Sequence, residues 1–202
     1  DPPILSQDYV WVGTEGEGIF IADNGDAAFD TNDINSVFVQ SNDFEDVRYV
    51  YDIVRAPGTH GATAVLYAAT TNGVWRSPDG GNTWNERGRF SGDFINCLAI
   101  HPASTGGADD ILYAGTETAG VWVSQDSGTS WVPYTDGMIL FEPPVNPPDN
   151  LWDGTWDERR RIMDLMVDDT NNLLYGITYF WQSGDPMPTG SVFAYRLNQD
   201  GT

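Results

Sequence analysis

Aromatic rings and carboxylates alternate in two segments of the chain, and this combination suits the recognition of a sugar. Rings stack on the apolar faces of sugars, while carboxylate and guanidinium groups bond to sugar hydroxyls. The first segment contains Trp152, Asp153, Trp156, Asp157, Glu158 and Arg159. The second contains Tyr179, Phe180, Trp181 and Asp185. Together with Glu117, which lies in a third connection, the rings and Arg159 are the ligand-binding candidates.

Hydrolysis of a glycosidic bond would need two carboxyl groups, one on each side of the bond. The catalytic candidates are Asp153, Asp157 and Asp185, and nothing in the sequence pairs any two of them. The alternative is that the rings pack these long segments against the rest of the protein, with the prolines of residues 143–148 stiffening them. Sugar binding and loop packing therefore both stay open, although long connections without regular structure are more often functional than ordinary ones.

The charge of the chain excludes one class of partner. It carries 30 acidic and 9 basic residues, a formal net charge of -21, and contains no lysine. Nucleic acid is not expected as a partner, because binding it begins with cationic groups that neutralise phosphates. The acidity is explained either by solubility at a cell surface or outside the cell, or by acidic loops that bind calcium or a cationic partner.

Two groups of acidic and amide residues are the candidates for calcium. They are Asp30, Asn32, Asp33 and Asn35, and Asp168, Asp169, Asn171 and Asn172. Neither group has the spacing of an EF-hand loop, with its central glycine and distal glutamate. No cofactor is therefore predicted, and calcium stays the alternative.

The single cysteine and the two histidines point to no reactive site. Cys97 lies in an apolar run, so we predict that it is a small buried core residue and not a reactive thiol. His60 and His101 are too few for a histidine-rich metal site. No apolar stretch reaches the length of a membrane span, and the first residues do not resemble a signal peptide.

The elements that position these residues are repeated along the chain. Residues 66–70, 73–77, the turn 78–82 and residues 83–87 return in the same order as residues 112–116, 120–124, 125–129 and 130–134. An apolar segment precedes each copy, at 47–54 and at 94–101. Four short strands repeated about every 40 to 50 residues are typical of a propeller blade. We predict an all-β fold, a β-propeller of four-stranded antiparallel blades.

The repeat also predicts how the single domain, residues 1–202, is divided. Residues 1–46 form an incomplete blade, 47–92 and 93–137 form two blades, 138–158 form an inserted loop, and 159–202 form another incomplete blade. The first blade lacks an inner strand and the last lacks an outer one. Unpaired sheet edges invite aggregation. We therefore expect a piece of a longer protein, or a chain whose propeller is closed by another molecule.

Two turns carry a recognisable motif. Ser77, Asp79, Gly81, Thr83 and Trp84 fit the pattern Ser-x-Asp-x-Gly-x-Thr-Trp in full. Ser124, Asp126, Gly128 and Trp131 fit it again, with Ser130 in place of threonine. On these residues the chain resembles the Asp-box, or BNR-repeat, propeller proteins. That group includes sialidases, xyloglucan-cleaving glycosidases, sortilin-like receptors and many uncharacterised secreted bacterial proteins.

The resemblance implies a fold and an orientation. In the turn, Asp and Ser side chains cap backbone groups, Gly supplies a positive φ, and Trp fixes the returning strand. These are structural roles, and in the family the turns lie on the face opposite the ligand site. A sialidase would also need an arginine triad and an Arg-Ile-Pro signature, whereas this chain has Arg161, Ile162 and Met163.

Three functions follow from these observations. The first is a secreted or cell-surface propeller that binds a glycan or a protein without catalysis. The second is part of a glycoside hydrolase, sialidase-like or xyloglucanase-like. The third is a structural unit that another chain completes.

Overall fold

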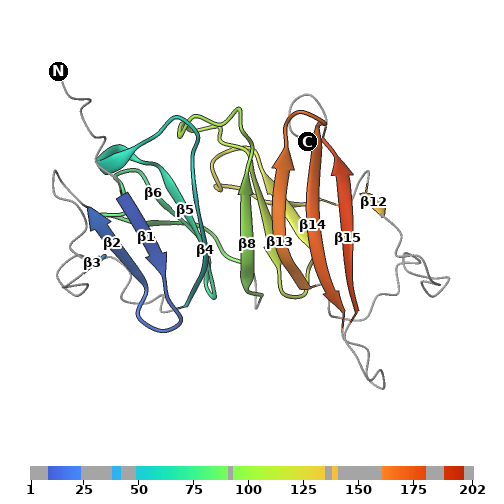
Figure 1. Cartoon of the computed structure of the whole chain (residues 1–202), viewed down its shortest axis with the longest axis horizontal. Coiled ribbons are helices and arrows are strands. Elements are labelled where there is room, and N and C mark those ends of the chain that lie inside the picture. Colours follow the sequence, from blue (N-terminus) through green and yellow to red (C-terminus); the bar gives the residue numbers. More distant parts are fainter. Residues whose placement is uncertain are drawn as a thin grey trace, which may run out of the picture.

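The computed structural model describes residues 9–23, 38–41, 49–90, 93–134, 138–140, 161–180 and 189–197. These residues form four antiparallel sheets, which stand side by side along the long axis of the molecule (Figure 1). Only a short 3-10 turn, η2 (Gly61–Thr63), is helical in this part of the chain. The predicted all-β fold of antiparallel propeller blades is confirmed.

We call the sheets blades one to four in chain order. Blade one contains β1 (Tyr9–Gly13), β2 (Ile19–Asp23) and β3 (Phe38–Gln40). Blade two contains β4 (Val50–Arg55), β5 (Leu66–Thr70), β6 (Gly73–Ser77) and β7 (Asn85–Gly88). Blade three contains β8 (Ile95–Ile100), β9 (Leu112–Thr116), β10 (Val121–Ser124) and β11 (Val132–Pro133). Blade four contains β12 (Met138–Leu140), β13 (Arg161–Asp168), β14 (Leu173–Phe180) and β15 (Thr189–Arg196).

Blade four differs from the arrangement expected from the sequence. Residues 138–140, expected as the start of an inserted loop, form β12, which pairs antiparallel with β15. The strand order is β12-β15-β14-β13, so the outer strand, β12, precedes the inner strand, β13, in the sequence. Blade four therefore has four strands where three were expected. The physical reason is that β15 would otherwise present a row of unpaired backbone groups at its edge.

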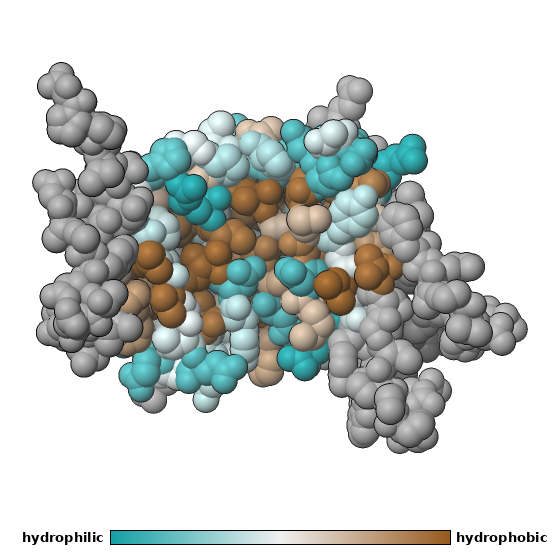
Figure 2. All heavy atoms as spheres, viewed as in Figure 1, coloured by the Kyte–Doolittle hydropathy of each residue, from teal (hydrophilic) through white to brown (hydrophobic). Residues whose placement is uncertain are grey.

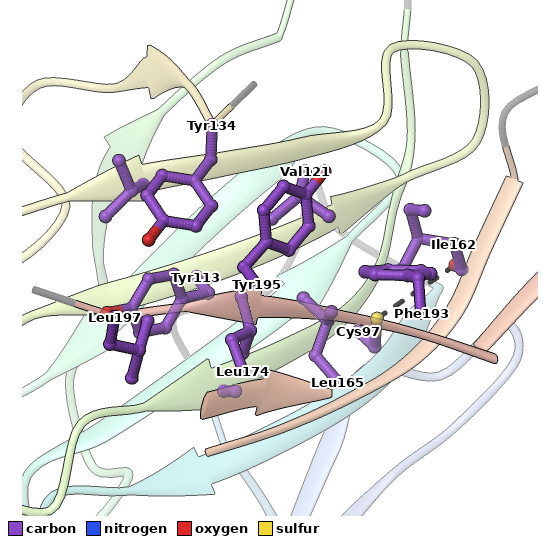
Figure 3. Packing of buried hydrophobic residues seen from close by; sticks show 12 residues of the cluster. Cys97, Tyr113, Val121, Tyr134, Ile162, Leu165, Leu174, Phe193, Tyr195 and Leu197 are labelled. Atoms are coloured by element: carbon purple, nitrogen blue, oxygen red, sulfur yellow. Dashed lines mark hydrogen bonds between the residues drawn. The ribbon is translucent and has the colours of Figure 1, made fainter. Parts of the chain in front are cut away.

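Apolar side chains pack the blades against one another in three successive layers. Ile19 of blade one packs with Val50 and Leu66 of blade two, and Tyr67 of blade two packs with Leu112 of blade three. The third layer joins blades three and four around the rings of Tyr113, Tyr134 and Tyr195 (Figure 3). Tyr134 and Tyr195 approach to 4.8 Å between ring centroids. Cys97 belongs to this layer and is buried, which confirms its prediction as a core residue.

The two motif-bearing turns close by the same hydrogen bonds. The Ser77 hydroxyl accepts from the Gly81 N–H at 2.8 Å and donates to Asp79, whose carboxylate accepts from the Thr83 N–H at 2.8 Å. In the second turn the Ser124 hydroxyl accepts from the Gly128 N–H at 2.8 Å and donates to Asp126, which accepts from the Ser130 N–H at 2.7 Å. Gly81 and Gly128 have φ of 93° and 83°, in the region that favours glycine.

The two ends of the blades are thereby distinguished. The turn at Gly80 lies against the connection between β4 and β5, because the Gly80 N–H donates to the Ala64 carbonyl. At the other end, the β9–β10 loop lies beside the start of β8, since the Glu117 N–H donates to the Phe94 carbonyl. The β1–β2 loop occupies this same end, at the bottom of Figure 1. The motif-bearing turns thus occupy one rim of the blades, and the β1–β2 and β9–β10 loops occupy the opposite rim.

Candidate functional site

Most of the ligand-binding candidates and all three catalytic candidates of the sequence lie outside the described residues. This group consists of Trp152, Asp153, Trp156, Asp157, Arg159, Trp181 and Asp185. Tyr179 and Phe180 form the end of β14, where only their backbone is described. Glu117 is the candidate whose side chain the structure places. It lies in the β9–β10 loop, on the rim opposite the motif-bearing turns.

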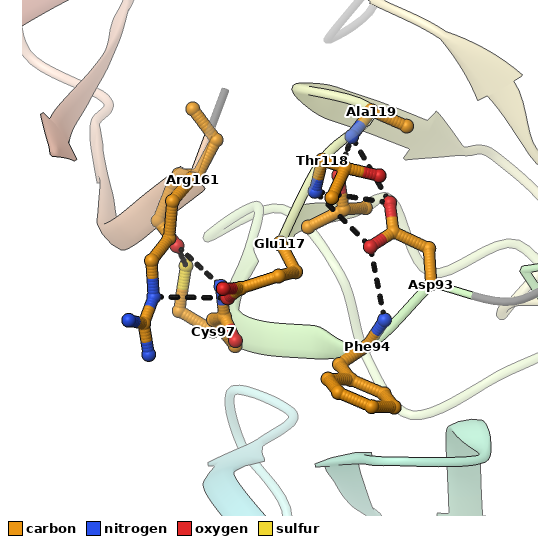
Figure 4. A network of polar contacts seen from close by, with 10 residues as sticks. Asp93, Phe94, Cys97, Glu117, Thr118, Ala119 and Arg161 are labelled. Carbon is orange, nitrogen blue, oxygen red and sulfur yellow. Dashed lines mark hydrogen bonds and ion pairs between the residues drawn. The ribbon is translucent and has the colours of Figure 1, made fainter. Parts of the chain in front are cut away.

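Glu117 joins blades three and four through polar contacts. Its carboxylate accepts a hydrogen bond from the Asn96 amide at 3.0 Å and forms an ion pair with Arg161 at 2.9 Å (Figure 4). Asn96 belongs to β8 and also donates to the Ile162 carbonyl at 3.2 Å. Arg161 is the first residue of β13 and stays partly exposed. The side chains of Glu117 and Arg161 are therefore held in place but remain accessible from solvent.

Asp93 fixes the loop that carries Glu117. Its buried carboxylate accepts from the backbone N–H groups of Phe94, Thr118 and Ala119, each at 3.0 Å (Figure 4). The Thr116 hydroxyl donates to the Gly120 carbonyl at 2.9 Å and closes the loop from the other side. Hydrogen bonds from N–H groups to a buried carboxylate are among the strong ones. The loop is therefore preorganised.

The inner strands of three blades share an irregularity at this rim. The register shifts between Val50 and Asp52 in β4, between Ile95 and Cys97 in β8, and between Ile162 and Asp164 in β13. The extra residues at these shifts are Tyr51, Asn96 and Met163. A bulge redirects a side chain out of the regular pleat. Tyr51 and Met163 are exposed, and Asn96 reaches Glu117.

Further aromatic rings are exposed where the inner strands begin. Tyr49 forms a bridge with Glu15 just before β4, and Phe94 precedes β8. Both rings are exposed, as is that of Tyr51. We call the following residues the rim patch: Tyr49, Tyr51, Phe94, Asn96, Glu117 and Arg161. In Figure 2, hydrophobic groups occupy the middle of the face formed by the inner strands, and hydrophilic groups line its two rims.

The charges of neighbouring loops act on the central ring of the patch. The pKa of the Tyr51 phenol is raised by its partial burial and then by the carboxylates Glu15 and Glu117, while Arg161 acts to lower it. Tyr51 therefore stays protonated and can donate a hydrogen bond. The arrangement combines flat apolar surface with hydrogen-bonding groups, as a sugar site requires.

Sequence reasoning missed Asp93, Asn96 and the three exposed rings. Tyr49, Tyr51 and Phe94 lie within the apolar segments 47–54 and 94–101, which the sequence assigns to inner strands with buried side chains. The bulges that redirect Tyr51 and Asn96 have no sequence signal here. The sequence does show aromatic residues at the start of consecutive apolar segments, and this recurrence was the available clue to the rim patch.

The acidic groups considered for calcium are only partly described. Residues 30–35 lie outside the described part of the chain. Asp168 accepts from the backbone N–H and the side-chain amide of Asn171, at 3.1 and 2.7 Å, and these bonds lower its pKa. Among the described residues, no three His, Cys, Asp or Glu side chains are grouped to hold a metal ion.

Asp52, one residue beyond the bulge of β4, predicts a pH effect. Its half-buried carboxylate accepts from the Leu98 N–H at 2.8 Å and so joins blades two and three. Burial raises the pKa of Asp52 above its ordinary 3.8, against the lowering effect of backbone hydrogen bonds from Leu98 and Ile53, and Asp164 raises it further. The folded state therefore holds this proton at a higher pH than the unfolded chain does. Its contribution to the free energy of unfolding is fully present below pH 3.8 and is lost as the pH rises through the folded pKa.

The effect of Asp52→Asn on stability is therefore expected to be more favourable at neutral pH than in acid. The free energy of unfolding of the variant relative to the wild type, measured by urea denaturation, should increase from pH 3 to pH 7. Asp79→Asn is the control of opposite sign. Partial burial acts to raise the pKa of Asp79, but hydrogen bonds from Thr83 and Ser77 outweigh it and lower the pKa. Asp79→Asn should therefore lower the free energy of unfolding more at pH 7 than at pH 3. The same pH trend in both variants would contradict the opposite directions of the Asp52 and Asp79 pKa shifts.

Comparison with known proteins gives two informative relatives. No protein-family model matches the chain. Over 116 residues the chain is 31% identical to a xyloglucanase of Hypocrea jecorina, an alignment that covers 56% of this chain and 13% of that protein. Its structure is similar to the crystal structure of a GH74 enzyme of Niastella koreensis, with a TM-score of 0.60 and 17% identity, over 100% of this chain and 28% of that one. The chain thus spans less than a third of either relative, and the structural likeness concerns the fold.

Proposed function

We propose that this chain is part of a glycoside hydrolase of the xyloglucanase type, and that its rim patch binds a polysaccharide. The single observation that carries the proposal is the rim patch itself, where exposed rings surround a fixed carboxylate. The 31% identity to a xyloglucanase supports xyloglucan, or a related polysaccharide, as the ligand. Of the functions expected from the sequence, the hydrolase therefore has more support than the non-catalytic binding module.

The physical basis of binding is stacking combined with a preorganised loop. Sugar rings can stack on Tyr51 and Phe94, while Glu117, Asn96 and Arg161 supply acceptors and donors for hydroxyls. Asp93 fixes the Glu117 loop before any ligand arrives, so little conformational entropy is lost when the ligand binds. This preorganisation favours a binding role over a purely structural one.

Hydrolysis needs a second carboxyl group on the other side of the bond. Glu117 is a candidate for one carboxyl group, because it lies on the rim beside the exposed rings. Asp153, Asp157 and Asp185 are the candidates for the other, and they stay outside the described residues. The chain then contributes part of a cleft whose remaining wall comes from elsewhere in the enzyme.

A polysaccharide ligand implies a location outside the cell. We infer that the protein is secreted or displayed at the cell surface, with a glycan as its partner, and that its acidity serves solubility there. No helix within the described residues is long and apolar enough to cross a membrane.

Substitutions in the rim patch test this proposal. Tyr51→Ala and Glu117→Gln are each expected to weaken binding of soluble xyloglucan about five- to twentyfold, because each removes one stacking or polar contact. Affinity would be measured by isothermal titration calorimetry. Glu86→Gln is the matched control, since Glu86 is also a glutamate paired with an arginine, Arg89, at 2.7 Å but lies on the outer strand β7.

The outcomes separate the candidate functions. Loss of affinity in both rim variants but not in Glu86→Gln supports the proposal. Binding of xyloglucan without release of reducing ends, by the chain and by the longest protein that contains it, supports the non-catalytic module instead. If the rim variants bind as well as the wild type, the rim patch is not the site.

A further inference from the structure

The inner strands β4, β8 and β13 stand side by side, and each lies at the end of its own sheet (Figure 1). Backbone groups on the free edge of such a strand have no partner within the sheet. Side chains of one blade bond to two of these groups on the next blade. The Asp52 carboxylate accepts from the Leu98 N–H at 2.8 Å, and the Asn96 amide donates to the Ile162 carbonyl at 3.2 Å.

The first of these bonds links two bulges that serve the rim patch. Asp52 directly follows Tyr51, the extra residue of β4, and Leu98 lies two residues after Asn96, the extra residue of β8. Tyr51 and Asn96 belong to the rim patch but to different blades. The bond between Asp52 and Leu98 therefore fixes the position of one bulge relative to the other.

The hydrogen bond at Asp52 also holds the bulge of β4 in register. Tyr51 is left over where the ladder on β5 passes from Thr70 to Ala69. A change of register by one residue would move Asp52 by about 3.3 Å along the strand. That shift is more than a hydrogen bond can span, so the bond to β8 would break. The bulge, and with it the direction of the Tyr51 side chain, is tied to this bond.

Blade three shows that stacking of the blades does not require a carboxylate at this position. The residue that follows the bulge of β8 is Cys97, equivalent to Asp52 by strand register. Its thiol lies 4.0 Å from the Ile162 carbonyl, a weak contact beside the 2.8 Å bond of Asp52. The extra residue of that bulge, Asn96, is held by its own amide bonds to Glu117 and Ile162. The carboxylate thus occurs beside the bulge whose extra residue is an exposed ring.

We propose that Asp52 is a positioning residue for ligand binding at the rim patch. Its bond to Leu98 holds the Tyr51 ring in place relative to blade three, which supplies Glu117. The inference rests on the proposed function, since it concerns the same ligand. A ring that is held before the ligand arrives loses little conformational entropy on binding. Asp52 therefore raises affinity without touching the ligand.

Two substitutions separate the acceptor of Asp52 from its charge. Affinity for soluble xyloglucan is measured at pH 7 by isothermal titration calorimetry, as for the rim patch variants. Asp52→Ala removes the acceptor of the Leu98 N–H and should weaken binding about three- to tenfold. Asp52→Asn keeps a side-chain oxygen that can accept, and should bind within about twofold of the wild type. With Tyr51→Ala already present, Asp52→Ala should weaken binding by less than about twofold, because the ring that it positions is gone.

Tyr67→Phe is the matched control, because it breaks another hydrogen bond between blades two and three. The Tyr67 hydroxyl donates to Asp110 at 2.7 Å, and the Asp110 N–H donates to Ser127 of the second motif-bearing turn, on the opposite rim. The affinity of this variant should equal that of the wild type. If Tyr67→Phe weakened binding as much as Asp52→Ala, looser packing between the blades would explain both, and the proposal would be overturned.

The position of the Tyr51 ring is also measured without ligand, which separates failure of this inference from failure of the proposed function. The protein is labelled with fluorotyrosine, and the fluorine NMR resonance of Tyr51 is assigned by its loss in Tyr51→Phe. That resonance should stay in place in Asp52→Asn and should shift or broaden in Asp52→Ala. Circular dichroism and the urea midpoint establish that each variant folds, and Asp52→Val replaces Asp52→Ala if the latter does not.

Three further results would overturn the positioning role. They are an unchanged Tyr51 resonance in Asp52→Ala, full affinity in Asp52→Ala while Tyr51→Ala binds more weakly, and an Asp52→Asn variant that binds as weakly as Asp52→Ala. In each of these cases the rim patch itself still stands. If the resonance shifts in Asp52→Ala but no variant, Tyr51→Ala included, changes affinity, the proposed function fails and the positioning role in binding fails with it.

Discussion

Asp110→Ala is expected to lower the free energy of unfolding by about 3–5 kcal/mol, the range for breaking a buried charged network. Asp110 of blade three is buried and accepts from the Tyr67 hydroxyl of blade two at 2.7 Å. Its other oxygen accepts from the N–H groups of Thr105 and Gly106, at 2.9 and 2.8 Å. Alanine would leave these donors without their acceptor, and the Tyr67 side chain is fully buried. Urea denaturation followed by tryptophan fluorescence measures the loss.

The neighbouring residue provides a matched control for Asp110. Asp109→Ala removes the same charge one position earlier, at an exposed side chain, and is expected to change the free energy of unfolding by less than about 0.5 kcal/mol. Tyr67→Phe isolates the contact between blades, and its effect should be non-additive with that of Asp110→Ala. Equal losses in the Asp109 and Asp110 variants would show that net charge, and not the network, is responsible.

Trp84→Ala is expected to cost about 3–5 kcal/mol, as for other large buried aromatic residues. Trp84 is 5% exposed, and its indole N–H donates to the Gly81 carbonyl at 3.0 Å within the turn. The ring also belongs to the apolar layer between blades one and two. Its removal therefore opens a cavity between two blades and loosens a turn, and the midpoint of urea denaturation should fall accordingly.

Trp131→Ala compares the second motif with the first. Trp131 makes the same bond, from its indole N–H to the Gly128 carbonyl at 2.9 Å, but its side chain is only partly buried against Phe90. We expect a smaller loss than for Trp84, because less apolar surface returns to water. A larger loss for Trp131 would mean that each tryptophan stabilises the protein mainly through its turn and not through the apolar layer between blades.

The strand pattern was predictable because it is written in local sequence. Alternating apolar residues and Gly-rich turns specify strands and hairpins over a few residues. The repeat between residues 66–87 and 112–134 then predicts that the same hairpins recur, as they do in blades two and three. The burial of Cys97 followed from its apolar neighbours in the same way.

The rim patch could not be predicted because its members are distant in sequence. Asn96 and Glu117 lie 21 residues apart, and Arg161 joins them from another blade. Their juxtaposition depends on the stacking of blades, while Tyr51 is redirected by a bulge. The position of β12 is equally non-local, because a strand pairs with whichever free edge the folded sheet presents.

The sequence by itself determined the class of fold and the hairpins of blades two and three. Those properties depend on side-chain alternation and on turn geometry, both of which act between residues close in the chain. Only the tertiary structure decided that Glu117 pairs with Arg161 beside exposed rings, on a loop that Asp93 fixes. These properties depend on contacts between blades, which exist only after the sheets have stacked.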